Sequence, residues 1–146
     1  CGQLRADLRD PDSILQAIIP PHNGKVVYLN IWAAWNAESR AELKQVATLK
    51  QELEGRDVVY IYVVNNSTEF AVRNISAEEG LTGDNVIHYN LPVGQQDALE
   101  KKYATTGYPC YLLIDSEGRV ANNRAPLPSQ ATLLREQIDK LLDDKK

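Results

Sequence analysis

The residues whose types could support chemistry gather in two short segments. The first follows a run of apolar residues and precedes a helical pattern, and it contains Trp35, Asn36, Ala37, Glu38 and Ser39. The second stands directly before another apolar run and contains Tyr108, Pro109 and Cys110. A thiol can act as a nucleophile once it is deprotonated, whereas a serine hydroxyl needs a neighbouring base. Neither histidine lies in a segment expected to reach Ser39, so Cys110 is the one candidate catalytic residue.

The cysteines and histidines are too few and too scattered for a metal centre. The chain has Cys1 and Cys110, and it has His22 and His88. A structural zinc site needs several converging ligands, and a disulfide framework needs several cysteine pairs, so we expect no metal and no cofactor. Cys1 has two readings, either the lipid-bearing first residue of a mature bacterial lipoprotein or the first residue of a cut domain.

The composition is that of one ordinary globular domain. The 146 residues are 43% hydrophobic and 25% charged, with a net charge of -4. This length supports one compact core, and the absence of a polybasic run argues against nucleic acid as a partner. No apolar run approaches the roughly 20 residues that cross a bilayer, so no transmembrane segment is expected in this chain. The sequence has no methionine, which indicates a processed product or an excised piece.

The residue pattern predicts strands and helices that bring the two segments together. A short helix begins at the Asp10-Pro11 pair. Continuous apolar runs over Lys25–Ala33 and Asp57–Val64 predict buried parallel strands, joined by one amphipathic helix over Asn36–Glu54. Further expected elements are a helix over Ser67–Ala77 with Phe70 in its apolar pattern, an edge strand over Asn85–Tyr89, a helix over Gln95–Tyr103, a hairpin of strands Cys110–Ile114 and Arg119–Ala121, and a final helix capped by Ser129. In such a mixed sheet the turn at Trp35 faces the segment at Pro109.

Three stretches taken together resemble the thioredoxin superfamily, and more closely the TlpA/ResA-type thiol–disulfide oxidoreductases of bacterial envelopes. VVYLNIWAAWNAESRAEL resembles the strand and helix around the family's W-C-x-x-C motif, GYPCYLLIDSEGRV its cis-proline segment, and NNRAPLPSQATLLREQIDKLL the ending common in Bacteroidetes members. The resemblance implies an α/β thioredoxin-like fold, with a central mixed β-sheet flanked by helices. It also implies a cis bond between Tyr108 and Pro109. We expect residues 1–23 to form an N-terminal extension with a short helix and residues 24–146 to form the thioredoxin-like domain.

The chain departs from the family at the reactive positions. The nucleophilic cysteine falls on Asn36 and the resolving cysteine on Ser39, and an acidic residue common after the second parallel strand is replaced by Asn65-Asn66. Thiol–disulfide exchange needs a thiolate that attacks a disulfide sulfur. An amide has no ionisable nucleophile and a serine hydroxyl is too weakly acidic, so the motif is degenerate and two-cysteine catalysis is predicted to be absent. Asn36 and Ser39 are expected to cap the helix instead.

Two functional hypotheses follow. The first is a redox-inactive binding or structural module, in which the former active-site surface at Trp35, Tyr108 and Pro109 holds an extended peptide or protein, for example by strand addition. The second is an oxidoreductase-related protein that uses the single thiol of Cys110. Strand alternation predicts that Cys110 points away from this surface and is a buried structural residue. The resemblance implies the bacterial periplasm or cell envelope, with a lipid anchor as one reading of Cys1.

Overall fold

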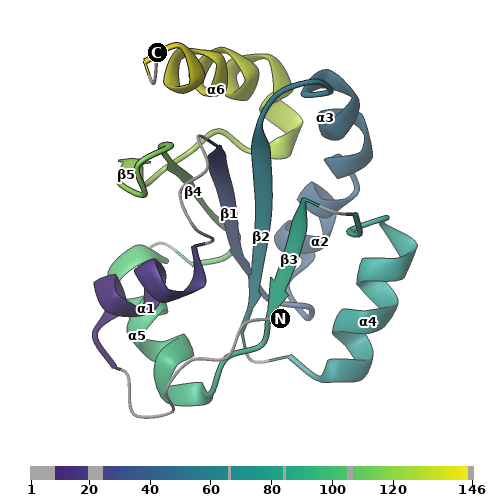
Figure 1. Ribbon diagram of the computed structural model, residues 1–146. Helices are drawn as coiled ribbons and strands as arrows, with labels where there is room; N and C mark the ends of the chain where they lie inside the picture. The colour runs from purple at the N-terminus through teal and green to yellow at the C-terminus, as the bar shows by residue number, and fades with distance from the viewer. Residues whose placement is uncertain (1–8, 20–24, 66, 84, 105–106, 145–146) are drawn as a thin grey trace.

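The fold is built on one five-stranded sheet with the strand order β3-β2-β1-β4-β5 (Figure 1). The computed structural model describes residues 9–19, 25–65, 67–83, 85–104 and 107–144. The strands are β1 (Val26–Trp32), β2 (Val58–Val64), β3 (Val86–Tyr89), β4 (Cys110–Ile114) and β5 (Val120–Asn122). Because β1 pairs in parallel with β2 and antiparallel with β4, the predicted mixed sheet is confirmed.

Helices cover both faces of this sheet (Figure 1). The apolar cluster on one face includes residues of α1 (Pro11–Ile18) and α5 (Val93–Tyr103). The cluster on the other face includes residues of α2 (Ala37–Leu43), α3 (Val46–Glu52), α4 (Glu69–Glu78) and α6 (Ala131–Asp144). Every residue of β1 and β2 is buried for this reason. The central strands therefore need apolar side chains at consecutive positions, which is the pattern that predicted them.

The division of the chain into residues 1–23 and 24–146 stays a prediction. Its helical part, α1, starts at Asp10, whose side chain accepts a hydrogen bond from the backbone N–H of Ser13 as the capping pattern predicted. Ile14, Leu15 and Ile18 of this helix are buried in the same cluster as the strands. The short helix is thus packed into the domain core on the α5 side.

The long helix predicted over Asn36–Glu54 is wrong, because the structure has two helices there, α2 and α3. At the junction the N–H of Gln45 donates to the carbonyl of Glu42 at 3.0 Å, a three-residue step that tightens the helix for one turn. Leu43 and Val46, on either side of the junction, are both buried. Apolar spacing of three residues fits an unbroken helix and a broken one equally well, so the pattern could not reveal the break.

The helix cap predicted at Ser129 is also wrong. Ser129 lies inside η1 (Pro128–Gln130), a short 3₁₀ helix that precedes α6. Its N–H and hydroxyl both donate to the carboxylate of Glu42, each at 2.9 Å. The side chain therefore ties η1 to α2 rather than starting α6.

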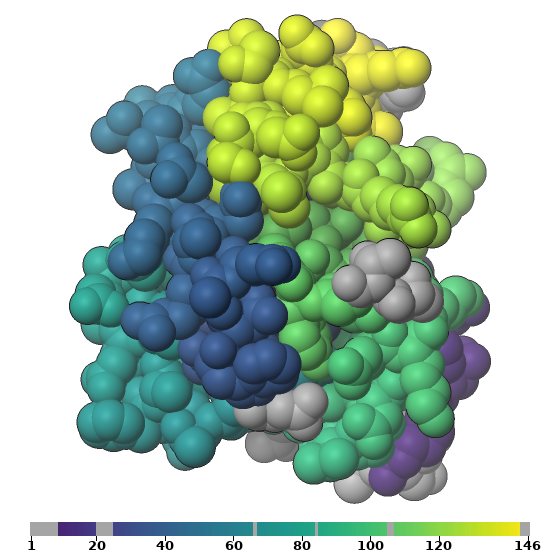
Figure 2. Space-filling model, turned by 180° about the vertical axis from the view of Figure 1, so that it is seen from behind, coloured from purple at the N-terminus to yellow at the C-terminus, as the bar shows by residue number. Residues whose placement is uncertain are grey.

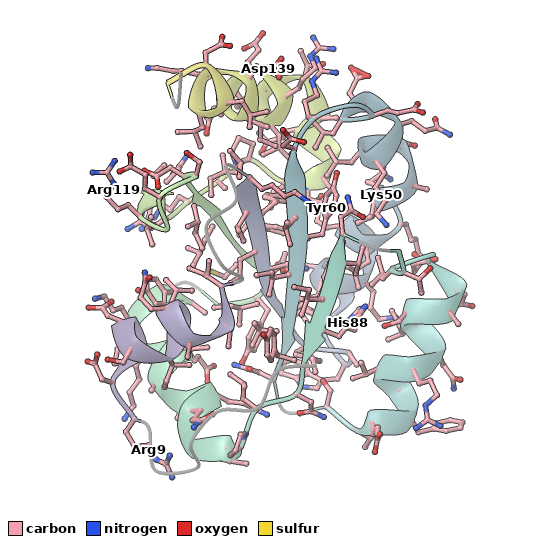
Figure 3. The ribbon with its side chains drawn as sticks, viewed as in Figure 1. Arg9, Lys50, Tyr60, His88, Arg119 and Asp139 are labelled. Carbon is pink, nitrogen blue, oxygen red and sulfur yellow. The ribbon has the colours of Figure 1, made fainter. Side chains whose placement is uncertain are left out.

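Tyrosines line the sheet face beneath α2 and α3. Tyr28 and Tyr111 are stacked with ring centroids 5.1 Å apart, and Tyr28 meets Tyr60 edge to face at 6.4 Å. The ammonium of Lys50 on α3 lies 5.5 Å from the centre of the Tyr60 ring, and Figure 3 shows the two side chains next to one another. Tyr28, Tyr60, Tyr62 and Tyr111 are all buried.

Candidate functional site

The turn after β1 ends on an asparagine that caps α2. Asn36 has the extended backbone of an N-cap, with φ −87 and ψ 120, and its Oδ1 accepts a hydrogen bond from the N–H of Ser39 at 2.7 Å. Its own N–H donates to the carbonyl of Ala33 at 3.1 Å. The predicted capping role of Asn36 is confirmed. An amide used in this way satisfies one of the free N–H groups of the first helical turn.

Ser39 does not cap the helix, contrary to the prediction. It is 0% exposed, and its Oγ accepts a hydrogen bond from the N–H of Ala33 at 3.5 Å. Ser39 already stands in the first turn of α2, so its hydroxyl faces back toward the end of β1. His88 is held elsewhere, with its Nε2 2.7 Å from the carbonyl oxygen of Leu81. His22 lies outside the described residues.

The two segments singled out in the sequence meet at an aromatic contact. Trp35 is 62% exposed, and its ring stands edge to face against that of Tyr108, with centroids 5.8 Å apart. The peptide bond between Tyr108 and Pro109 is cis, the isomer that the family resemblance implies. Figure 2 shows α2 in dark blue and the green segment near residue 110 together on this face of the molecule. We call Trp35, Tyr108 and Pro109 the aromatic surface.

The remaining residues of the turn are open to solvent. Ala37 and Glu38 form the exposed start of α2, and Glu38 lies in its first turn. A carboxylate there complements the positive end of the helix dipole. This placement accounts for Glu38 without a catalytic role.

Cys110 points away from the aromatic surface, into the cluster that includes α1 and α5. It is 8% exposed, and its Sγ donates a hydrogen bond to the carbonyl of Tyr103 at 3.1 Å. Burial raises the pKa of the Cys110 thiol to about 11. A thiol held protonated in this way is a poor nucleophile, because only the thiolate attacks a disulfide.

We expect Cys110 to react slowly with a disulfide reagent at pH 8. A pKa near 11 leaves about one thiol in a thousand ionised, whereas an unperturbed cysteine is about one quarter ionised at this pH. The folded protein should therefore react at least about a hundredfold more slowly at this site than the protein in concentrated urea. A Cys1→Ser variant isolates the signal of Cys110. Equal rates in the folded and unfolded protein would contradict the buried assignment.

Two asparagine side chains are buried in or directly after the parallel strands. Asn65 follows β2, is fully buried and lies with its Nδ2 3.5 Å from the carbonyl of Gln96, while Asn66 is outside the described residues. Asn30 in the middle of β1 is 1% exposed, and its side-chain atoms have no hydrogen-bond partner within the described ranges. The sequence analysis did not single out Asn30. Its signal was an amide inside an otherwise apolar strand.

The predicted burial of Phe70 is wrong. This side chain was assigned to the apolar face of a helix, but it is 74% exposed on the first turn of α4. Ala71 and Ile75, four residues apart, form the face of α4 that packs against the core. Phe70 is one residue, or about 100°, away from that face. It lines a hollow between α2 and α4 together with Ala34 and Arg40, which we call the α4 hollow.

A second hollow lies on the other side of the turn. We call it the Pro109 hollow, and the residues that line it are Tyr103, Pro109, Cys110, Tyr111, Asn123, Arg124, Ala125 and Leu127. The strand order separates the two hollows, because α4 follows β2 on one side of β1 while Pro109 precedes β4 on the other side. The aromatic surface therefore lies between the two hollows, each of which has one arginine in its lining.

Within the described ranges, no three histidine, cysteine or acidic side chains come together in a way that could hold a metal ion. In the same part of the chain, no helix has the length and apolar character needed to cross a bilayer.

Comparison with known proteins identifies the family. The model of the family described as thioredoxin-like matches residues 23–120, whereas no curated protein sequence matches the chain. A solution structure of a presumed thiol–disulfide oxidoreductase from Bacteroides vulgatus is 23% identical, with a TM-score of 0.65 over 97% of this chain and 91% of that one. A crystal structure with the same description and organism is 27% identical, with a TM-score of 0.57 over 83% and 78%. A thioredoxin-like protein from Parabacteroides distasonis is 21% identical, with a TM-score of 0.60 over 98% and 91%. The chain belongs to the thioredoxin-like family.

Proposed function

We propose that this domain is a thioredoxin-like binding module that has lost dithiol catalysis. The observation that carries the proposal is the use of Asn36, at the position of the family's nucleophilic cysteine, as the N-cap of α2. The second cysteine position holds the buried Ser39. Reduction of a disulfide transfers two electrons from two thiols, and neither position carries sulfur. The turn keeps its place in the fold while its side chains serve the helix.

The proposed ligand is an extended polypeptide lying across the aromatic surface. Trp35 is a large apolar side chain at 62% exposure, held against Tyr108 and so restricted in orientation. Rigid, exposed aromatic rings are the residues that most often dominate the energy of a protein interface. The two hollows on either side of Trp35 offer room for neighbouring side chains of a bound segment.

The competing hypothesis, a one-cysteine oxidoreductase, gains no support from the surroundings of Cys110. Its thiol is buried and bonded to a backbone carbonyl, and burial raises its pKa. A catalytic thiol needs the opposite environment, exposed and near positive charge. We assign Cys110 a structural role.

We further propose that the module works in the bacterial periplasm or cell envelope. The proposal rests on the resemblance to TlpA/ResA-type domains and on neighbours that include a thiol:disulfide interchange protein from a Bacteroides species. Cys1, the residue on which a lipid anchor would depend, lies outside the described residues.

A fluorescence titration tests the binding proposal. The chain has two tryptophans, and Trp32 is fully buried, so changes on ligand binding report on Trp35. Adding a permanently unfolded, carboxymethylated polypeptide should produce a saturable change in emission and protect Trp35 from iodide. A Trp35→Ala variant lacks this reporter, so its binding is measured by calorimetry, and its affinity should be at least about tenfold lower if Trp35 is a dominant contact. An emission spectrum that stays unchanged up to millimolar polypeptide would refute the proposal.

A further inference from the structure

Four of the seven arginines that the structure describes pair with acidic side chains. Arg56 pairs with Asp139 at 3.0 Å and Arg135 with Glu52 at 2.7 Å, and Arg73 and Arg119 also have carboxylate partners. Figure 3 shows Asp139 on α6 at one end of the molecule and Arg119 on the turn after β4. In an acidic protein such pairing is expected, because carboxylates outnumber cations.

Arg40 and Arg124 are different. Neither side chain makes an ion pair or a hydrogen bond with any described residue, and both are exposed. Arg40 projects from α2 into the α4 hollow, and Arg124 lines the Pro109 hollow in the segment after β5. Among the described arginines, the two whose side chains have no such partner thus line the two hollows that adjoin the aromatic surface.

The sheet order sets these cations on opposite sides of Trp35. The α4 hollow includes Ala34, the residue before Trp35, and lies on the β2 side of β1. The Pro109 hollow lies on the β4 side, next to the Tyr108 ring that contacts Trp35. A segment crossing the aromatic surface from one hollow to the other would pass Arg40, then Trp35, then Arg124.

Carboxylates are the groups that this arrangement recognises. A guanidinium presents a planar fork of donors that matches a carboxylate, and it is less strongly hydrated than an ammonium. Two acidic side chains would repel a carboxylate ligand. They are Glu78 in the α4 hollow and Glu38 on the first turn of α2. Glu78 stands with Arg40 in one hollow, whereas the lining of the Pro109 hollow includes no acidic residue. The stronger contribution is therefore expected from Arg124.

We propose that the ligand of the aromatic surface is an acidic extended peptide, with an apolar residue over Trp35 and carboxylates on both sides directed toward Arg40 and Arg124. This inference rests on the proposed binding function and specifies its ligand. Charge complementarity selects the partner, while the aromatic contact supplies the apolar area. An exposed ion pair is weak, so the selectivity comes from the two together.

Three synthetic nonapeptides test the inference on the native chain. They share a central Val-Leu-Val and carry glutamate, glutamine or lysine at the same two flanking positions. At low salt the glutamate peptide should bind about tenfold more tightly than the glutamine peptide, and the lysine peptide most weakly. The differences should shrink in 0.5 M salt because ions screen exposed charges.

Variants assign the preference to the two arginines. The double variant Arg40→Gln and Arg124→Gln should bind the glutamate and glutamine peptides equally, while Arg119→Gln, an arginine on the turn after β4, should keep the preference. Glu78→Gln should tighten binding of the glutamate peptide. Equal binding of all three peptides by the native chain would overturn the acidic preference but leave the binding function standing. If no peptide binds and Trp35 emission does not respond, both proposals fail.

Discussion

The double variant Asn36→Cys and Ser39→Cys is expected to form a disulfide at the start of α2. The two positions are the N-cap and the third residue of the helix, and the N–H of Ser39 already reaches the Asn36 side chain at 2.7 Å. Such positions suit the spacing of about 5.5 Å between Cα atoms that a disulfide prefers. The positive end of the helix should also lower the pKa of the thiol introduced at position 36.

Forming the disulfide between positions 36 and 39 should stabilise the folded protein. The chain-entropy estimate gives about 2 kcal/mol of stabilisation for the oxidised form over the dithiol. Loss of the asparagine cap costs about 1 kcal/mol relative to the native chain, and this cost is the same in the oxidised and the dithiol form. The check is a mass loss of two hydrogens after exposure to glutathione disulfide, with urea unfolding of both forms. Each single cysteine variant is a control, because neither can close the loop. A folded double variant that remains a dithiol would show that the turn lacks the motif's geometry.

Alkaline pH is expected to unfold the protein through its buried tyrosines. Burial raises the pKa of Tyr28, Tyr62 and Tyr111 above the usual range, with neighbouring tyrosines adding to the effect. Burial also raises the pKa of Tyr60 to about 12. The folded state therefore keeps protons that the unfolded chain releases near pH 10. Stability is full below pH 10 and is lost as pH rises toward and past 12.

The size of this effect is large compared with a typical folding free energy. Each of the three most buried tyrosines costs about 1.4 kcal/mol per pH unit above 10, so stability should be about 4 kcal/mol lower at pH 11 than at pH 9. Urea unfolding at several pH values measures the loss, and tyrosinate absorbance at 295 nm should rise together with the loss of circular dichroism. Tyr28→Phe removes one titrating group and should flatten the pH dependence. Tyrosines that titrated near pH 10 in a protein still folded would contradict the buried assignment.

The central strands were predictable because their chemistry is local. β1 and β2 are covered on both faces, so their sequences must be apolar at consecutive positions, and no other segment has this pattern together with β-branched residues. The start of α1 was predictable for the same reason, since Asp10 and Pro11 determine the cap by themselves. The pairing of β1 with β4 followed from the order of elements.

Other features depend on contacts between distant residues. The break between α2 and α3 leaves the apolar spacing unchanged, and the bonds from Ser129 to Glu42 join positions far apart in the chain. Phe70 could have faced the core or the solvent, and the packing of Ala71 and Ile75 decides which. The spacing of apolar residues along the chain therefore could not predict the helix break, the Ser129–Glu42 bonds or the exposure of Phe70.

The candidate site was predictable in part. The order of strands and helices predicted that the turn at Trp35 faces the segment at Tyr108-Pro109, and the contact between the rings of Trp35 and Tyr108 confirms that placement. The sequence could not show that the side chains of Arg40 and Arg124 make no ion pair with a described residue. Which arginines pair with carboxylates depends on the folded positions of both groups. Ser39 was expected to cap α2, but it is buried in the first turn of that helix while Asn36 forms the cap.

Insulin reduction tests the central claim, a thioredoxin-like site without thiol turnover, most directly. With dithiothreitol as the electron donor, the native chain should precipitate the insulin B chain no faster than dithiothreitol alone, since Asn36 and Ser39 supply no sulfur and Cys110 is buried. The double cysteine variant at positions 36 and 39 serves as the positive control on the same scaffold. A rate above background that depends on the native chain, and disappears in a Cys110→Ser variant, would contradict the account and establish the one-cysteine alternative.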